Sequence, residues 1–421
     1  MAWRRLGLVS PKSDEGGGAP PLGIQSAAVC RRAATGQGKP ESFFAPWRLC
    51  IIICCGRRGI ERKSLPKAPN WENKKPTNNS VKPANTCLIL GAGASKPYGY
   101  PLGPELSKAI IDLGMQGKDY WAEKEKLLQV KDWAITVATK FAKCRLSKPT
   151  MTIDEFLDRQ YPGIEQRAPG DNPEWNEFST AKMLICDIIR RCEQPQKGVL
   201  DWYQLLFEHL ERSVTAECPW QLRIITFNYD RSLEFYLARY HAMKTGLLQQ
   251  ETRRWLLERV SFAHVYGDVG PLPDGQPKRD EFAPEYGVWR GGEFWKGREK
   301  IEIIRALDPN PDSSGRYRSW IANAEYVIVL GFGYDKMNCS RLGLSENLPE
   351  KCVFTTAYDR DMHPQIEDLL SGCGYYLGLP GEDCYSFLLR TEVLTWALNG
   401  LPAVELLARL NGKNGGTMKT A

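Results

Sequence analysis

The sequence of 421 residues lacks the long apolar run that a membrane-spanning helix requires. Its longest apolar run, Leu49–Cys55, has seven residues, whereas a helix that crosses a bilayer needs about 20. The chain also lacks a strong excess of one charge, because it holds 56 Lys and Arg against 50 Asp and Glu. With 42% hydrophobic residues, the composition is that of a folded globular protein. We therefore expect no membrane insertion.

Cysteine pairs with the C-x-x-C spacing are missing, although the chain has 13 cysteines. That spacing is typical of zinc ribbons and thioredoxin-like redox pairs, so the sequence indicates neither. Scattered thiols without a recognisable secretory signal are typical of reduced cytoplasmic proteins. We therefore expect a cytoplasmic protein that binds no metal.

Charge is distributed unevenly between the start of the chain and the rest. Residues 1–80 hold 14 Lys and Arg against 5 Asp and Glu, a net charge of +9, which leaves 6 − 9 = −3 for residues 81–421. The first 80 residues also contain 9 Gly and 8 Pro and show no helical or strand period. This pattern predicts a disordered basic extension, a folded domain over 81–400 and a C-terminal tail over 401–421. The acidic balance of the domain does not favour nucleic-acid binding.

Short apolar segments alternate with helical patterns from residue 86 onward, which predicts an α/β fold. The expected architecture is a Rossmann-like, mostly parallel sheet with helices on both faces and a helical insertion at about 115–220. Ligands of such sheets bind at the carboxyl ends of the strands. The expected strands are Thr86–Leu90, Arg223–Phe227, Ser261–Tyr266, Tyr326–Leu330 and Cys352–Thr356.

A glycine-rich segment, Gly91-Ala92-Gly93-Ala94-Ser95, follows the first expected strand. Glycines at this place let the backbone approach a pyrophosphate. Lys96 stands where the third glycine of the G-x-G-x-x-G motif would be. The segment therefore fits either a phosphate-binding loop or a tight turn between strand and helix.

Asn228 and Asp230 follow the second expected strand, on either side of Tyr229. In an extended segment their side chains would project to the same side, where they could orient a sugar hydroxyl and an amide. Alternatively, Asp230 caps the next helix, with Glu234 within reach of a capping interaction. Both interpretations can hold together.

His264 and the segment Gly331–Asn338 are the remaining candidates. His264 is the one histidine of four that lies at a strand end beside glycines. A histidine pKa near neutrality suits a general base, although a lone histidine can equally be structural. Gly331-Phe332-Gly333 repeats the pattern of an apolar strand followed by glycines, and it could also be a plain loop.

Taken together, these motifs resemble the sirtuin-like family, in particular its divergent prokaryotic branch that consumes NAD in antiphage defence. The resemblance covers about residues 85–380 and depends on the order of the motifs as well as their content. In chain order they are GAGAS, GYPLG (99–103), IDEFL (153–157), TFNYD (226–230), HVYGDVG (264–270), GFGYDKMN (331–338), RLGL (341–344) and TTAYD (355–359).

The resemblance implies roles for the site residues. Asn228 and Asp230 match the sirtuin Asn-x-Asp that contacts nicotinamide and its ribose, and His264 matches the catalytic histidine. The resemblance also implies two groups of residues that contact NAD. At the phosphates these are Gly91, Ala92, Gly93 and Ser95, and at the adenosine half they are Gly331, Gly333 and Asn338. The zinc-binding cysteine quartet of protein deacylases is absent.

The resemblance and the residues together predict an NAD glycohydrolase that depletes cellular NAD, with Asn228 as ribose clamp, Asp230 at the carboxamide and His264 as base. The products would be nicotinamide and ADP-ribose, or a cyclised form. A protein deacylase, an ADP-ribosyltransferase and a non-catalytic nucleotide sensor are the alternatives. Because such a hydrolase must stay silent until triggered, we expect a homo-oligomer or a separately encoded partner such as an ATPase.

Overall fold

The computed structural model describes residues 82–116, 128–164, 172–193, 202–212, 222–273, 283–288, 294–303, 311–348 and 351–413. All of them belong to one unit, Lys75–Ala421. Residues 1–80, including the apolar run Leu49–Cys55, lie outside the described residues, so the disordered basic extension stays a prediction. Within the described ranges, no helix is long and apolar enough to cross a membrane.

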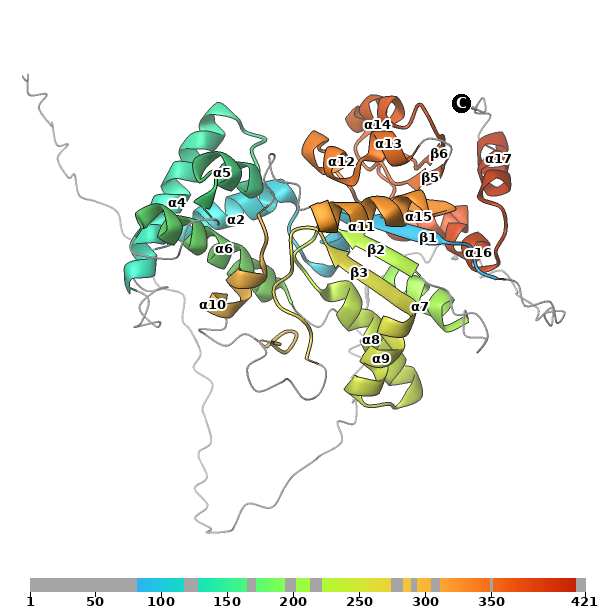
Figure 1. Cartoon of the computed structure of the whole chain (residues 1–421), viewed down its shortest axis with the longest axis horizontal. Helices are drawn as coiled ribbons and strands as arrows, with labels where there is room; N and C mark the ends of the chain where they lie inside the picture. The colour runs from blue at the N-terminus through green and yellow to red at the C-terminus, as the bar shows by residue number, and fades with distance from the viewer. Residues whose placement is uncertain are drawn as a thin grey trace, which may run out of the picture. The chain divides into compact units, whose positions relative to one another are not determined.

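Six strands form one sheet in the order β3-β2-β1-β4-β5-β6, and every neighbouring pair is parallel (Figure 1). The α/β, Rossmann-like fold expected from the sequence is therefore confirmed. Both central strands, β1 and β4, are buried along their whole length, as expected for strands that are covered on both faces. The strands are β1 (Thr86–Leu90), β2 (Leu222–Thr226), β3 (Val260–His264), β4 (Tyr326–Leu330), β5 (Cys352–Thr355) and β6 (Gly374–Leu377).

The register of the strands brings their carboxyl ends to one edge of the sheet. Leu90 of β1 pairs with Thr226 of β2 and with Leu330 of β4, and Thr226 pairs with His264 of β3. The chain runs outward from β1 to β3 and then returns to place β4 on the other side of β1. The space beyond β1 and β4 is thus the switch point at which open α/β sheets bind ligands.

Two groups of helices accompany the sheet. In the first group α7 contacts α8, α15 and α16, and in the second α11 contacts α12 and α13; Figure 1 shows α11 crossing in front of the strands. The segment expected as a C-terminal tail begins with helix α17, which packs on β6. The bounds are α7 (Trp202–Arg212), α8 (Ser232–Thr245), α9 (Gln249–Arg259), α11 (Pro311–Ala322), α12 (Lys336–Leu342), α13 (Leu344–Asn347), α14 (His363–Leu369), α15 (Cys384–Thr391), α16 (Val393–Leu398) and α17 (Ala403–Lys413).

Helices between β1 and β2 form a bundle at one side of the sheet (Figure 1). Helices α2, α4 and α6 contact one another, and α5 contacts α2 and α4. Helix α6 begins after Asn172, whose side chain caps it by accepting a hydrogen bond from Glu174 N at 2.9 Å. The bounds are α2 (Gly103–Met115), α4 (Leu128–Ser147), α5 (Ile153–Gln160) and α6 (Pro173–Cys192), with short helices at α1 (Ala92–Ser95), η1 (Lys96–Tyr98), α10 (Phe294–Gly297), η4 (Arg298–Lys300) and η5 (Arg360–Met362).

Candidate functional site

The loops that follow β1 and β4 touch through their glycines. Gly93 N donates a hydrogen bond to Gly331 O at 3.0 Å. A Cβ on Gly93 would lie 2.8 Å from Gly331 Cα, and Gly331 itself has φ +59° with no room for a side chain. These two glycines allow the two loops to make close backbone contact, and neither is among the residues that line the cavity at this edge of the sheet.

A cavity of about 600 Å³ lies beyond the carboxyl ends of β1, β2 and β4. It is bounded on its far side by the loop before α5 and by the first turn of that helix. Seven of the ten site residues predicted from the sequence line it together: Gly91, Ala92, Ser95, Asn228, Asp230, Gly333 and Asn338. The three others, Gly93, Gly331 and His264, do not.

Asn228 ties the end of β2 to the glycine loop. Its Nδ2 donates hydrogen bonds to Gly91 O at 3.0 Å and to Ser95 Oγ at 2.9 Å. Its main-chain N–H is held by Thr226 Oγ1 at 3.1 Å. These bonds use both amide protons of the side chain, so Oδ1 is the atom that Asn228 can offer to a ligand.

The structure supports only one of the two roles that the sequence left open for Asp230. Its carboxylate accepts hydrogen bonds from the main-chain N–H of Ser232, at 3.0 Å, and from the Ser232 hydroxyl, but the N-cap of α8 is Arg231, which has no side-chain cap. It also lines the cavity. Burial raises the pKa of Asp230, against the opposing effect of its hydrogen bonds with Ser232 and Ser95. Glu234 takes no part in the cap and pairs with His264 instead.

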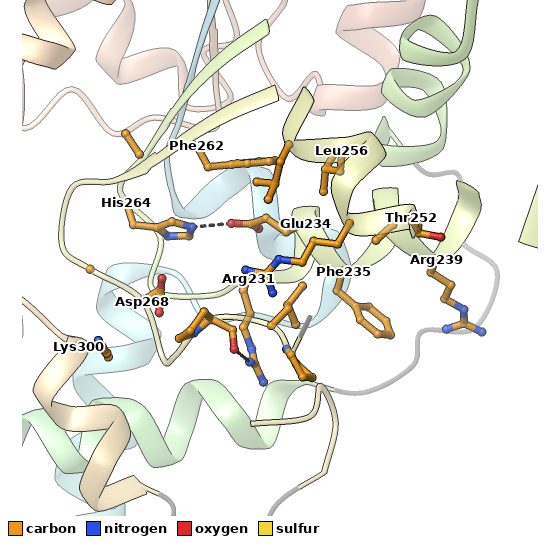
Figure 2. Close-up of a pocket in the computed structure, with 18 of the residues that line it drawn as sticks. Arg231, Glu234, Phe235, Arg239, Thr252, Leu256, Phe262, His264, Asp268 and Lys300 are labelled. Atoms are coloured by element: carbon orange, nitrogen blue, oxygen red, sulfur yellow. Dashed lines mark hydrogen bonds and ion pairs between the residues drawn. The ribbon is translucent and has the colours of Figure 1, made fainter. Parts of the chain in front are cut away.

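His264 does not line this cavity, and its ring points toward Glu234 of α8 (Figure 2). Its Nε2 lies 2.6 Å from Glu234 Oε1, and its Nδ1 lies 3.0 Å from Asn228 O. Burial lowers the pKa of His264, but the charge and hydrogen bond of Glu234 outweigh it and raise the pKa to about 10. The ring is therefore an imidazolium with both N–H groups bonded at neutral pH, and it has no free nitrogen with which to act as a base.

Asp154, in the first turn of α5, lines the cavity although it is not among the site residues predicted from the sequence. The hydroxyl of Tyr229 donates a hydrogen bond to its Oδ1. Burial raises the pKa of Asp154 to about 6, although the bond from Tyr229 opposes the shift. At neutral pH this carboxylate is ionised but poorly solvated, and such a group stabilises a positive charge brought close to it.

Tyr266 is the second such cavity residue. Strand β3 ends at His264, and the turn that follows carries the Tyr266 ring over to the candidate site, where its hydroxyl donates to Asn338 Oδ1 at 2.5 Å. Burial, and then the neighbouring Asp154 carboxylate, keep the pKa of Tyr266 well above its ordinary value. The hydroxyl is thus a permanent hydrogen-bond donor.

The cavity wall carries charges of both signs. Acidic side chains come from α5 and from the segments that follow β2 and β4, and two lysines, Lys148 and Lys336, lie among them. Lys148 pairs with Glu155 at 2.5 Å. In the part of the chain that the structure describes, no group of three or more His, Cys, Asp or Glu could hold a metal ion.

No protein-family model matches the chain, and no curated protein shows significant similarity to it.

Proposed function

We propose that the chain is an NAD glycohydrolase, which breaks the bond between nicotinamide and ribose in NAD. The observation that carries this proposal is that seven residues from three separate segments, predicted from sequence alone, surround one cavity at the switch point of the sheet. Its volume falls within the range of about 300–1,000 Å³ that is usual for sites of small molecules and cofactors.

In this proposal the pyrophosphate lies along the glycine loop. The N–H groups of Gly91, Gly93 and Ala94 donate to main-chain carbonyls. The loop residues that line the cavity are Gly91, Ala92 and Ser95. Lys336, which also lines the cavity, supplies a positive charge for a phosphate. The nicotinamide end of NAD then points toward Asp154.

The reaction needs little acid catalysis, because nicotinamide in NAD carries a positive charge and leaves as a neutral molecule. The electron pair of the breaking C–N bond stays on the nicotinamide nitrogen, and positive charge develops on the ribose. Asp154 stabilises that charge, and Asn228 Oδ1 orients a ribose hydroxyl or the attacking water. The water oxygen bonds to the ribose carbon and its proton passes to Asp154 or to solvent.

His264 has a positioning role in this mechanism. As an imidazolium it holds the main-chain carbonyl of Asn228 through Nδ1 and so fixes the residue that orients the ribose. This replaces the general-base role expected from the sequence. The same proposal includes NAD depletion in defence, which the resemblance implies. It also includes a trigger by oligomerisation or by a partner such as an ATPase, because a toxic hydrolase must stay silent until it is needed.

The test measures NAD binding by titration calorimetry and nicotinamide release by chromatography on the full chain. The matched pair is Asp154→Asn, in the cavity, and Asp158→Asn, one turn later on α5 and outside it. We expect hydrolysis to fall at least about 10²-fold in the first variant and to stay unchanged in the second. NAD binding without turnover in the parent favours a nucleotide sensor, and no binding refutes the proposal.

A further inference from the structure

A second cavity of about 730 Å³ lies against β3, α8 and α9, and none of its lining residues is shared with the first cavity. Figure 2 shows His264 and Asp268 at one side and Phe235 and Leu256 at the other. Of the residues that line this space, the proposed hydrolysis uses His264 alone, and only to position Asn228. Its size, like that of the first cavity, is that of a site for a small organic molecule.

One wall of this second cavity is apolar. Phe235 comes from α8, Leu256 from α9 and Phe262 from β3. Three further apolar residues follow the end of β3, Pro271, Leu272 and Pro273. A surface of two aromatic rings and several aliphatic groups suits a ligand with a flat, apolar body.

The charged side chains of the cavity leave an excess of positive charge. Lys300, Arg253 and Arg316 line it, together with Arg239 nearer the edge in Figure 2. Against these four cations stand two acids, Asp268 and Glu302, since Glu234 is neutralised by His264. Arg231 is already occupied, because its guanidinium bonds to Glu193 and to three main-chain carbonyls.

Arg253 is the cation that most needs a partner. Its Nη1 is buried and has no hydrogen-bond acceptor among the described residues. A buried donor without an acceptor is costly to the fold, and a charged donor is costlier than a neutral one. An anionic group on a bound molecule would supply both the acceptor and the counter-charge.

We propose that this second cavity binds a small organic anion with an aromatic body, the chemistry shared by nucleotides and aryl carboxylates. The aromatic part packs against Phe235 and Phe262, and the anionic group pairs with Arg253. The site adjoins the ion pair of His264 and Glu234, and His264 in turn holds Asn228. Regulation of NAD hydrolysis by this ligand is a consequence that depends on the proposed function, whereas the binding itself does not.

The test uses two dyes of similar shape, the anionic anilinonaphthalene sulfonate and its uncharged relative phenylnaphthylamine, titrated by fluorescence into the full chain. The variant is Arg253→Gln, and its control is Arg254→Gln, the exposed neighbour on α9 that does not line the cavity. Far-ultraviolet circular dichroism confirms that both variants are folded.

We expect one anionic dye per chain and at least about tenfold weaker binding in Arg253→Gln, the size of a lost charge-assisted hydrogen bond. Arg254→Gln and the uncharged dye should show no such change. Equal affinity of the anionic dye for the parent and Arg253→Gln overturns the proposal, as does an equal loss for both dyes. Because no step uses NAD, this result is independent of whether the chain hydrolyses it.

Discussion

The ionised carboxylate of Asp154 should lower the unfolding free energy of the protein, although the proposed reaction depends on it. Burial raises its pKa from an ordinary value of 3.8 to about 6. Protonation is thus favoured in the folded state, so the folded protein loses stability as the pH rises from about 4 to about 6. The difference between the two pKa values corresponds to a loss of at most about 3 kcal/mol of unfolding free energy above pH 6. Asp154→Asn removes this loss and keeps an oxygen that can accept the bond from Tyr229.

Urea unfolding of the parent and of Asp154→Asn at several pH values measures this effect. We expect the variant to gain up to about 3 kcal/mol of unfolding free energy at pH 8 and almost nothing at pH 4. Over the same range, kcat/KM of the parent for NAD should fall below about pH 6, where Asp154 becomes protonated. The variant should be slow at every pH. A variant that is less stable than the parent at pH 8 would refute the assignment of Asp154 as a strained functional carboxylate.

Three further predictions concern the glycines, the histidine and the substrate. Gly93→Ala should lower the unfolding free energy by about 1–3 kcal/mol, because its Cβ would meet Gly331, whereas Gly333→Ala, with nothing within 4 Å, should melt like the parent in calorimetry. His264→Gln should lower the unfolding free energy by about 3 kcal/mol at pH 7, because it leaves Glu234 unpaired. The pKa of His264 in the folded protein is about 10, so in the parent this stability is present below about pH 6.5 and is lost toward pH 10. Urea unfolding across that range checks the prediction, and an unchanged midpoint in the variant contradicts the ion pair. NAD but not NADH should be cleaved, since the reduced ring carries no positive charge, and chromatography of both reactions decides this.

The sheet and the cavity could be predicted because they depend on local patterns. Runs such as Tyr326–Leu330 are apolar without interruption, which indicates buried parallel strands, and glycines or polar residues directly after such runs mark the carboxyl edge. Strand β6 was not predicted, because the short segment Gly374–Leu377 begins with a glycine and has no long apolar run. The order of the helices and strands and the edge of the sheet that holds the site can thus be predicted from the sequence, whereas a short strand at the margin of the sheet cannot.

The roles of individual side chains were harder to predict because they depend on partners far away in the sequence. His264 looks like a free strand-end histidine until Glu234 of α8 is seen beside it. Asp154 looks like an ordinary acidic residue in the first turn of a helix, and only the fold brings Tyr229 to it. Gly93 fits a phosphate loop equally well whether it faces a ligand or, as here, the backbone of Gly331.

We propose that the nicotinamide bond of NAD is cleaved in the cavity at the switch point of the sheet. A single-turnover reaction, with the full chain in excess over NAD, tests this proposal by counting nicotinamide against NAD consumed. We expect one nicotinamide for each NAD with the parent, and at least about 10²-fold slower release with Asp154→Asn. NAD left intact by the folded parent, or equal rates with the two proteins, would contradict it.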